Sequence, residues 1–317
     1  MRIFVLGKVA SVTNWLEDCV AALRADGHEV RVGATRNPRI SLAIENLTLS
    51  PAIGSPMAGA IARAVRRFSP ELILAFGAYH IPRVILESVG AITGRAPMIG
   101  WVGDVYDENA GASAAPFDAV AYTDTALVAR HASLGFAGRA IWLPHAVNPH
   151  VTLPGPRTRR PMMVLIANPT AHRRAVVDGL DAPMALYGPA WTRSAGVDHR
   201  IHARRVAPAE LPALYAGHLA ALNIRNELNV LDGLNQRNFA PCLVATPVVA
   251  EHQPDLAACF EPGREVLAWR GSEELNAIYA RLRAEPAEAA AIGERARRRV
   301  LADHTYGKRL GVLRALN

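Results

Sequence analysis

The strongest constraint on the fold is the spacing of short apolar runs along the chain. Between residues 2 and 147, runs that are apolar at nearly every position alternate with helical patterns. Continuous apolar runs are typical of strands buried on both faces of a parallel sheet, and parallel strands need helical crossovers. The strands predicted for this half are 2–7, 29–34, 71–77, 97–103, 118–122 and 140–143.

The first two of these strands are joined by a clear amphipathic helix. Apolar residues recur with a helical period between positions 16 and 23; Thr13 or Asn14 can cap the first turn, and Gly27 can end the helix. A strand, a helix and a strand form a βαβ unit, whose crossover is right-handed. We therefore predict an open α/β sheet for the first half.

A polar, proline-rich and basic segment, 148–161, interrupts this pattern, and a second α/β series follows it. We predict an α/β protein with two Rossmann-like, doubly wound domains that face each other across a cleft, over 1–150 and 151–303, and a helix over 304–317 that packs back on the first domain. The second series has predicted strands at 162–167, 184–187, 219–224, 243–249 and 265–269 and predicted helices at 171–180, 208–216, 272–284 and 286–302.

Composition excludes several classes of protein. The chain has 317 residues, half of them hydrophobic and 20% charged, which is enough to fill cores and is unlike a disordered chain. Its three cysteines have no paired spacing, so neither a disulfide framework nor a zinc cluster can be read. The longest apolar stretch, 71–93, is broken by charged residues, and the first strand leaves no room for a signal peptide. We expect a soluble, cytoplasmic protein.

The net charge of +7 suggests anionic partners such as nucleic acid, lipid head groups or phosphate-bearing molecules. The arginines are scattered, and solvated helix faces account for most of the excess. No module that reads nucleic acid is visible, so no nucleic-acid partner is expected. No basic amphipathic helix clearly predicts membrane binding, and peripheral contact with an anionic membrane surface remains an open alternative.

Two common phosphate-binding motifs are missing. The run GKVAS at 7–11 follows the first strand but lacks the three-glycine spacing of a dinucleotide-binding turn, and the chain has no P-loop. An NAD-dependent dehydrogenase and a P-loop kinase are therefore not predicted.

Several ordered runs do point to a family. The run LRADGHEV at 23–30 is similar to the helix, Gly-His-Glu-Val turn and strand of the N-terminal domain of GT-B glycosyltransferases. The second half resembles the nucleotide-sugar-binding domain of the CgeB-like glycosyltransferases, well over 162–310 and loosely before that. The runs that carry this resemblance are LNI at 222–224, GLNQRNF at 233–239, FEPGREV at 260–266, SEEL at 272–275 and RVLADHTY at 299–306.

The resemblance implies a hexosyltransferase that takes a UDP-, GDP- or dTDP-linked sugar in the second domain and an unknown acceptor in the first, with no cofactor and no bound metal. A donor diphosphate needs cations and free N–H groups at helix N-termini. Arg237 is the strongest candidate to hold it, followed by Arg173 and Arg174 after a helix start at 168–170. A solvated basic face or an ion pair that orders a loop is the alternative for these arginines.

Three further residues are candidates for donor binding. Asn235 and Gln236 can bond sugar hydroxyls or satisfy loop backbone, and Gly188 can let the backbone approach the donor or serve a plain turn. Phe239 is expected in the core. Many family members have a glutamate after this phenylalanine, expected to bond the donor ribose, but Ala240 stands here. A lapsed enzyme that acts as a binding or scaffold component is therefore the second hypothesis.

Catalytic groups of GT-B enzymes usually come from the first domain, and ligands of open α/β sheets bind beyond the strand ends. His80, Asp104 and Asp107 follow predicted strands and are the catalytic candidates; the run WVGDVYD at 101–107 is similar to a Trp-x-x-Asp-Asp segment of the family. Asp124 and His145 are further positions to consider. Capping or turn roles are the alternative for the first four, and His145 could contact donor or acceptor. The pair His199 and His202 lies among arginines, which disfavours a metal cation, so no metal ligand is predicted.

Overall fold

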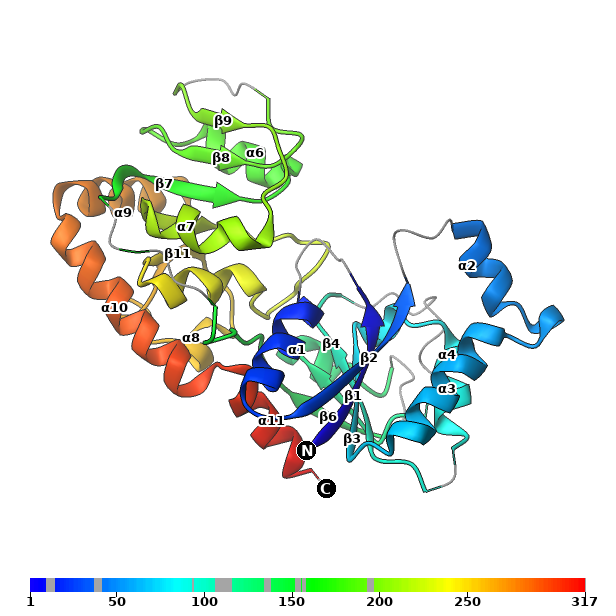
Figure 1. Cartoon of the computed structure of the whole chain (residues 1–317). Helices are drawn as coiled ribbons and strands as arrows, with labels where there is room; N and C mark the ends of the chain where they lie inside the picture. The colour runs from blue at the N-terminus through cyan, green and yellow to red at the C-terminus, as the bar shows by residue number, and fades with distance from the viewer. Residues whose placement is uncertain are drawn as a thin grey trace. The chain divides into compact units, whose positions relative to one another are not determined.

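The chain forms two compact units in the computed structural model (Figure 1). Unit 1 contains Met1–Pro144 and Tyr306–Asn317, and unit 2 contains His145–Thr305. Both ends of the chain therefore belong to unit 1. The structure describes residues 1–9, 15–36, 42–92, 94–105, 116–133, 138–151, 155, 158–192 and 197–316.

Unit 1 is built on a six-stranded parallel sheet with the order β2-β1-β3-β4-β5-β6. Its central strands are buried along their whole length, as expected when helices cover both faces. The strands are β1 (Arg2–Lys8), β2 (Glu29–Arg36), β3 (Leu72–Phe76), β4 (Met98–Val102), β5 (Ala119–Tyr122) and β6 (Arg139–Trp142). The helices are α1 (Trp15–Ala25), α2 (Leu42–Leu49), α3 (Pro56–Phe68), α4 (Arg83–Gly90), α5 (Thr125–Ala129) and α11 (Tyr306–Arg314), with short 3-10 turns η1 (Pro51–Ile53) and η2 (Ala78–His80).

Helix α11 completes the core of unit 1 although it comes last in the sequence. Figure 1 shows it, in red, beside α1, in blue. The Tyr306 ring lies 6.4 Å from Trp101, whose ring in turn lies 5.2 Å from Trp15 and 5.1 Å from Phe76. The Arg309 Nε atom donates to Pro144 O at 2.8 Å. The final helix thus supplies buried aromatic and polar contacts to the first sheet.

Unit 2 is built on a second six-stranded parallel sheet with the order β12-β11-β10-β7-β8-β9. Its strands are β7 (Arg160–Ile166), β8 (Ala185–Tyr187), β9 (Arg200–His202), β10 (His218–Asn223), β11 (Val248–Glu251) and β12 (Leu267–Trp269). Its helices are α6 (Ala171–Asp178), α7 (Leu211–Ala216), α8 (Leu256–Cys259), α9 (Ser272–Ala284) and α10 (Pro286–Asp303), with 3-10 turns η4 (Pro208–Glu210), η5 (Gln236–Asn238) and η6 (Ala240–Val244).

Unit 2 differs from the sequence-based prediction most clearly at two strands, and the short helix α8 was not predicted either. The predicted strand 243–249 begins only at Val248, because η6 occupies the preceding residues and Ala245 has a positive φ of 54°. Strand β9 was not predicted, since Arg200 and His202 give it no apolar run. The two-sheet α/β architecture is confirmed. None of the described helices is both long and apolar enough to cross a membrane.

Candidate functional site

The carboxyl ends of the strands of unit 2 gather at one edge of the sheet, which we call the carboxyl edge. Because all six strands are parallel, the segments that follow β7, β10 and β11 start there. Ligands of open α/β sheets bind at such an edge, outside the strand ends. The carboxyl edge is therefore the place to look for a site in this unit.

Helix α6 begins at the carboxyl edge, directly after β7. Thr170 caps it: its Oγ1 accepts a hydrogen bond from Arg173 N at 3.2 Å. The first N–H groups of a helix have no partner within the helix and carry a partial positive charge. The start of α6 thus offers donors suited to an anion.

The Arg173 side chain joins two loops at this edge. Its Nε and Nη2 atoms donate to Ile224 O at 3.2 and 3.1 Å, and Nη1 donates to Asn168 O at 2.9 Å. The residue is only 3% exposed. Burial, and next the charge of Arg237, lower the pKa of Arg173 to about 10, while Glu251 acts in the opposite sense. Arg173 therefore organises the loops after β7 and β10.

Arg174 lies on α6 and bonds the neighbouring loop after β8, which begins with Gly188. Arg174 donates to Thr192 Oγ1 at 3.2 Å and to Ala190 O at 2.8 Å, and its guanidinium lies 5.5 Å from the Trp191 ring centre. A Cβ atom on Gly188 would collide with Ala167 O. Gly188 therefore allows its own backbone to pack against the backbone of Ala167, rather than against a ligand.

The residues 235–237 form the start of η5. The Asn235 Oδ1 atom accepts from Arg237 N at 2.9 Å, and Gln236 Nε2 donates to Ala146 O at 2.7 Å. Arg237 is half-buried, and its charge acts on both Arg173 and Tyr215. Asn235 is thus the N-cap of η5, while Arg237 lies beside Arg173 at the carboxyl edge.

Phe239, at the end of this segment, is fully buried, and its ring centre lies 5.3 Å from that of Phe260 and 5.2 Å from that of His304. The expectation that it belongs to the core is confirmed.

A carboxylate that the sequence analysis missed holds the centre of this edge. Glu251 ends β11 and is 9% exposed. Its Oε atoms lie 3.0 and 3.1 Å from His172 Nε2, Oε2 accepts from Arg225 N at 3.0 Å, and Oε1 lies 3.3 Å from Arg225 Nε. The signal that could have found it is an acidic residue at the end of an apolar strand run.

The charges at the carboxyl edge are unequal. Arg173, Arg225 and Arg237 contribute cations, while Glu251 and the exposed Glu227, which lies 3.4 Å from Arg225, contribute anions. Together with the start of α6, this leaves a surplus of positive charge. The site can therefore attract an anionic ligand.

In unit 1 the structure brings two of the catalytic candidates close to one tyrosine. Tyr79 Oη donates to Asp104 Oδ2 at 2.9 Å, and the His80 ring centre lies 4.1 Å from that of Tyr79. Burial first, and then the nearby Asp104, raise the pKa of Tyr79. These residues follow β3 and β4 at the carboxyl edge of the first sheet. Asp107 lies outside the described residues.

The remaining candidates have local structural contacts. Asp124 is the N-cap of α5, accepting from Ala126 N at 2.9 Å. His145 is buried at the start of unit 2. The His199 Nδ1 atom accepts from Met184 N at 3.3 Å, and the His202 ring stacks on Tyr187 at 4.2 Å. Within the described part of the chain, no three His, Cys, Asp or Glu side chains form a group that could hold a metal.

Comparisons with known proteins place this fold. A family described as glycosyl transferase-like has a model that matches residues 170–315. No curated protein matches the sequence. Among solved structures, the Anabaena protein HepE (Alr3699) in complex with UDP-glucose is 12% identical, with a TM-score of 0.70 over 100% of this chain and 99% of that one.

Two further solved structures agree. Sucrose-phosphate synthase from Thermosynechococcus elongatus is 14% identical, with a TM-score of 0.65 over 99% of this chain and 98% of that one. AviGT4, a glycosyltransferase involved in avilamycin A biosynthesis, is 15% identical, with a TM-score of 0.61 over 100% and 97%. The chain therefore has the two-domain α/β fold of the GT-B glycosyltransferases, and its second half matches a glycosyl transferase-like family.

Proposed function

We propose that this protein is a glycosyltransferase of the hexosyltransferase class, which moves a sugar from a nucleotide diphosphate donor to an acceptor hydroxyl. The observation that carries the proposal is the coincidence of two features. The segment 170–315 matches the glycosyl transferase-like family, and it contains nearly all of the cationic carboxyl edge of unit 2. A similar fold is found with bound UDP-glucose in Anabaena HepE.

In this proposal unit 2 binds the donor at its carboxyl edge. The guanidinium of Arg237 and the first N–H groups of α6 face the diphosphate, where they stabilise its charge. Arg173 positions the loops after β7 and β10 and does not bind the diphosphate itself, because its three guanidinium nitrogen atoms already donate to backbone carbonyls. Glu251 orients Arg225 and His172 at the same edge. Neutralisation by these groups is the basis for expecting no resident metal.

Unit 1 is proposed to bind the acceptor. In the reaction, the acceptor oxygen forms a bond to the anomeric carbon as the bond from that carbon to the donor diphosphate breaks. The acceptor proton passes to a carboxylate or imidazole, for which Asp104 and His80 are the candidates, or to the leaving diphosphate. The hydrogen bond from Tyr79 would hold the Asp104 carboxylate in one orientation. We also infer a cytoplasmic location, from the cysteine usage, and no nucleic-acid partner.

The test is a panel of nucleotides and of UDP-, GDP- and dTDP-linked sugars, each scored by the melting temperature of the full chain. A saturable rise for one donor class is expected, because a ligand that binds only the folded state stabilises it. Arg237→Ala should weaken the Kd of that donor at least tenfold, whereas Arg298→Ala, an exposed arginine on α10, should leave it within twofold. No stabilisation by any member of the panel would refute the proposal.

A second candidate function rests on Ala240, where family members carry the glutamate expected to bond the donor ribose. Under this reading the protein binds the nucleotide but transfers no sugar, and serves as a binding or scaffold component. Binding of a donor without its consumption, in the presence of a broad set of acceptor sugars, lipids and peptides, would favour this candidate. Release of the free nucleoside diphosphate with any acceptor would exclude it.

A further inference from the structure

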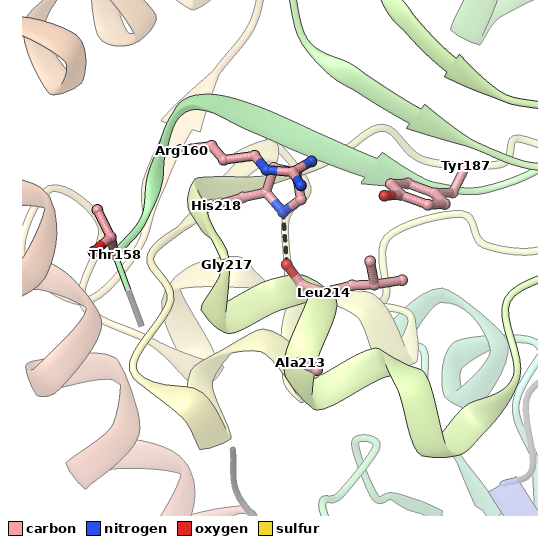
Figure 2. Close-up of a pocket in the computed structure, with 7 residues that line it drawn as sticks. All are labelled: Thr158, Arg160, Tyr187, Ala213, Leu214, Gly217 and His218. Carbon is pink, nitrogen blue, oxygen red and sulfur yellow. Dashed lines mark hydrogen bonds between the residues drawn. The ribbon is translucent and has the colours of Figure 1, made fainter. Parts of the chain in front are cut away.

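A pocket of unit 2 lies on a face of the sheet. It has a volume of about 340 Å³ and is lined by residues from the starts of β7 and β10, the end of β8, and α7 (Figure 2). That volume is at the lower end of the range for small-molecule sites. The lining residues are Thr158, Arg160, Tyr187, Ala213, Leu214, Gly217 and His218.

Strand pairing places two polar side chains of this pocket side by side. Arg160 and His218 are register partners on the neighbouring parallel strands β7 and β10. Paired residues on adjacent strands project from the same face of a sheet. Figure 2 shows both side chains in the space between β7 and α7. Since Arg160 is the first residue of β7, this end of the pocket lies away from the carboxyl edge.

The imidazole of His218 has one nitrogen bonded and the other without a partner. Its Nδ1 atom lies 2.6 Å from Leu214 O, and because a carbonyl only accepts, Nδ1 carries the proton. The Nε2 atom of this 2% exposed residue is buried and makes no hydrogen bond. A buried polar atom without a partner is destabilising, so a ligand that bonds Nε2 gains from satisfying it.

The charges around the pocket are cationic. Burial lowers the pKa of His218, while the hydrogen bond to Leu214 raises it. The positive charges of Arg160, His202 and Arg200 lower it further. The nearby carboxylate on η4, Glu210, is bound by Arg204 at 2.8 and 3.0 Å. The surroundings therefore favour an anion and disfavour a metal cation.

We propose that this pocket binds phosphate, either free or as a small phosphate monoester, between the guanidinium of Arg160 and the imidazole of His218. Arg160 contributes a fork of donors to the phosphate oxygens. The Nε2 lone pair accepts from the P–OH of a monoanion, or takes up that proton and donates to the dianion. A carboxylate or a sulfate carries no such proton at neutral pH, so the pair of residues selects phosphate over these two anions.

The experiment measures the melting temperature and, by calorimetry, the Kd of the full chain with inorganic phosphate, glucose 6-phosphate, sulfate and acetate. Phosphate or glucose 6-phosphate should bind saturably, at least tenfold more tightly than sulfate or acetate. If inorganic phosphate equals glucose 6-phosphate, the ligand is free phosphate; if glucose 6-phosphate binds more tightly, it is a monoester. The proposal is overturned if neither phosphate binds, or if sulfate binds as tightly.

Four variants locate the ligand. Arg160→Gln removes the exposed fork, and His218→Asn removes Nε2 while an amide N–H still reaches Leu214 O. Each should weaken phosphate binding at least tenfold and leave UDP binding unchanged, whereas Arg298→Gln, with the same loss of charge on α10, should alter neither. Arg237→Ala should weaken UDP binding and leave phosphate binding unchanged. If Arg237→Ala abolishes phosphate binding and Arg160→Gln does not, the phosphate belongs to the carboxyl edge and the proposal is wrong, whatever the fate of the glycosyltransferase assignment.

Discussion

Replacement of Arg173 by alanine separates a structural role from a ligand-binding role at the carboxyl edge. The guanidinium donates to two backbone carbonyls, those of Ile224 and Asn168. Counted once per carbonyl, two hydrogen bonds to a charged donor contribute about 3–6 kcal/mol. The burial that lowers the pKa of Arg173 to about 10 offsets part of this gain. We expect Arg173→Ala to destabilise unit 2 by roughly 3–4 kcal/mol.

For a unit of this size, that loss lowers the melting temperature by about 10 °C. Differential scanning calorimetry of the ligand-free chain measures it directly. Arg173→Met keeps most of the buried methylene chain and should recover only a small part of the loss. Arg174→Ala, on the exposed side of the same helix, should cost less than about 1 kcal/mol. If Arg173→Ala and Arg174→Ala melt within 2 °C of each other (roughly 1 kcal/mol), the assignment of Arg173 as an organiser of two loops is wrong.

Three further predictions concern unit 2. Glu251→Gln keeps one acceptor for Arg225 N but removes the charge between His172 and Arg225, and should lower stability by about 1–3 kcal/mol in urea unfolding. Gly293→Ala would make a Cβ atom collide with Ala245 O, and should cost about 1–3 kcal/mol, whereas Gly311→Ala meets nothing within 4 Å and should be neutral or stabilising. Burial lowers the pKa of three histidines of unit 2 from the usual value of 6.5, so on acidification the unfolded chain takes up more protons than the folded chain, and stability should fall as the pH drops from 7.5 to 5.5; they are His199, His202 and His218.

Each of these predictions has an outcome that contradicts it. A Glu251→Gln chain as stable as the parent would mean that the carboxylate charge facing His172 and the Arg225 guanidinium contributes nothing. Equal stability of Gly293→Ala and Gly311→Ala would show that α10 shifts away from η6 at no cost. Hydrogen exchange of unit 2 peptides that is equally protected at pH 7.5 and 5.5, after correction for intrinsic rates, would remove the argument about the histidines.

The architecture could be predicted because parallel strands buried on both faces leave continuous apolar runs. Strands β1, β3, β4 and β5 are such runs, and the predicted helices 272–284 and 286–302 match α9 and α10 closely. Strand β9 was not predicted because an edge strand of three residues, two of them polar, has no continuous apolar run. The start of β11 was misplaced because a short apolar run also suits a 3-10 turn; here Leu243 and Val244 belong to η6.

The candidate site could be predicted as a region but not as a set of contacts. Arg173, Arg174 and Arg237 were chosen for charge and position, and Arg173 and Arg237 do act on each other at one edge. The sequence does not reveal that Ile224 O and Asn168 O occupy the Arg173 fork, because this depends on how two loops meet. The bond from His172 to Glu251 joins residues 79 positions apart, and no local pattern encodes that distance.

The place of α11 has a consequence for synthesis on the ribosome. Unit 2 lies between the two segments that make up unit 1, so all of its residues emerge before Tyr306 does. Until then Trp101 lacks one of its ring neighbours and the Pro144 carbonyl lacks its donor, Arg309. Domains generally fold as units during synthesis. Unit 1 starts first but completes its folding last, and until α11 emerges the aromatic side chains around Trp101 are not covered by it. A stop codon at position 306 would therefore leave every residue of unit 2 in place and damage unit 1, which begins at the other end of the chain.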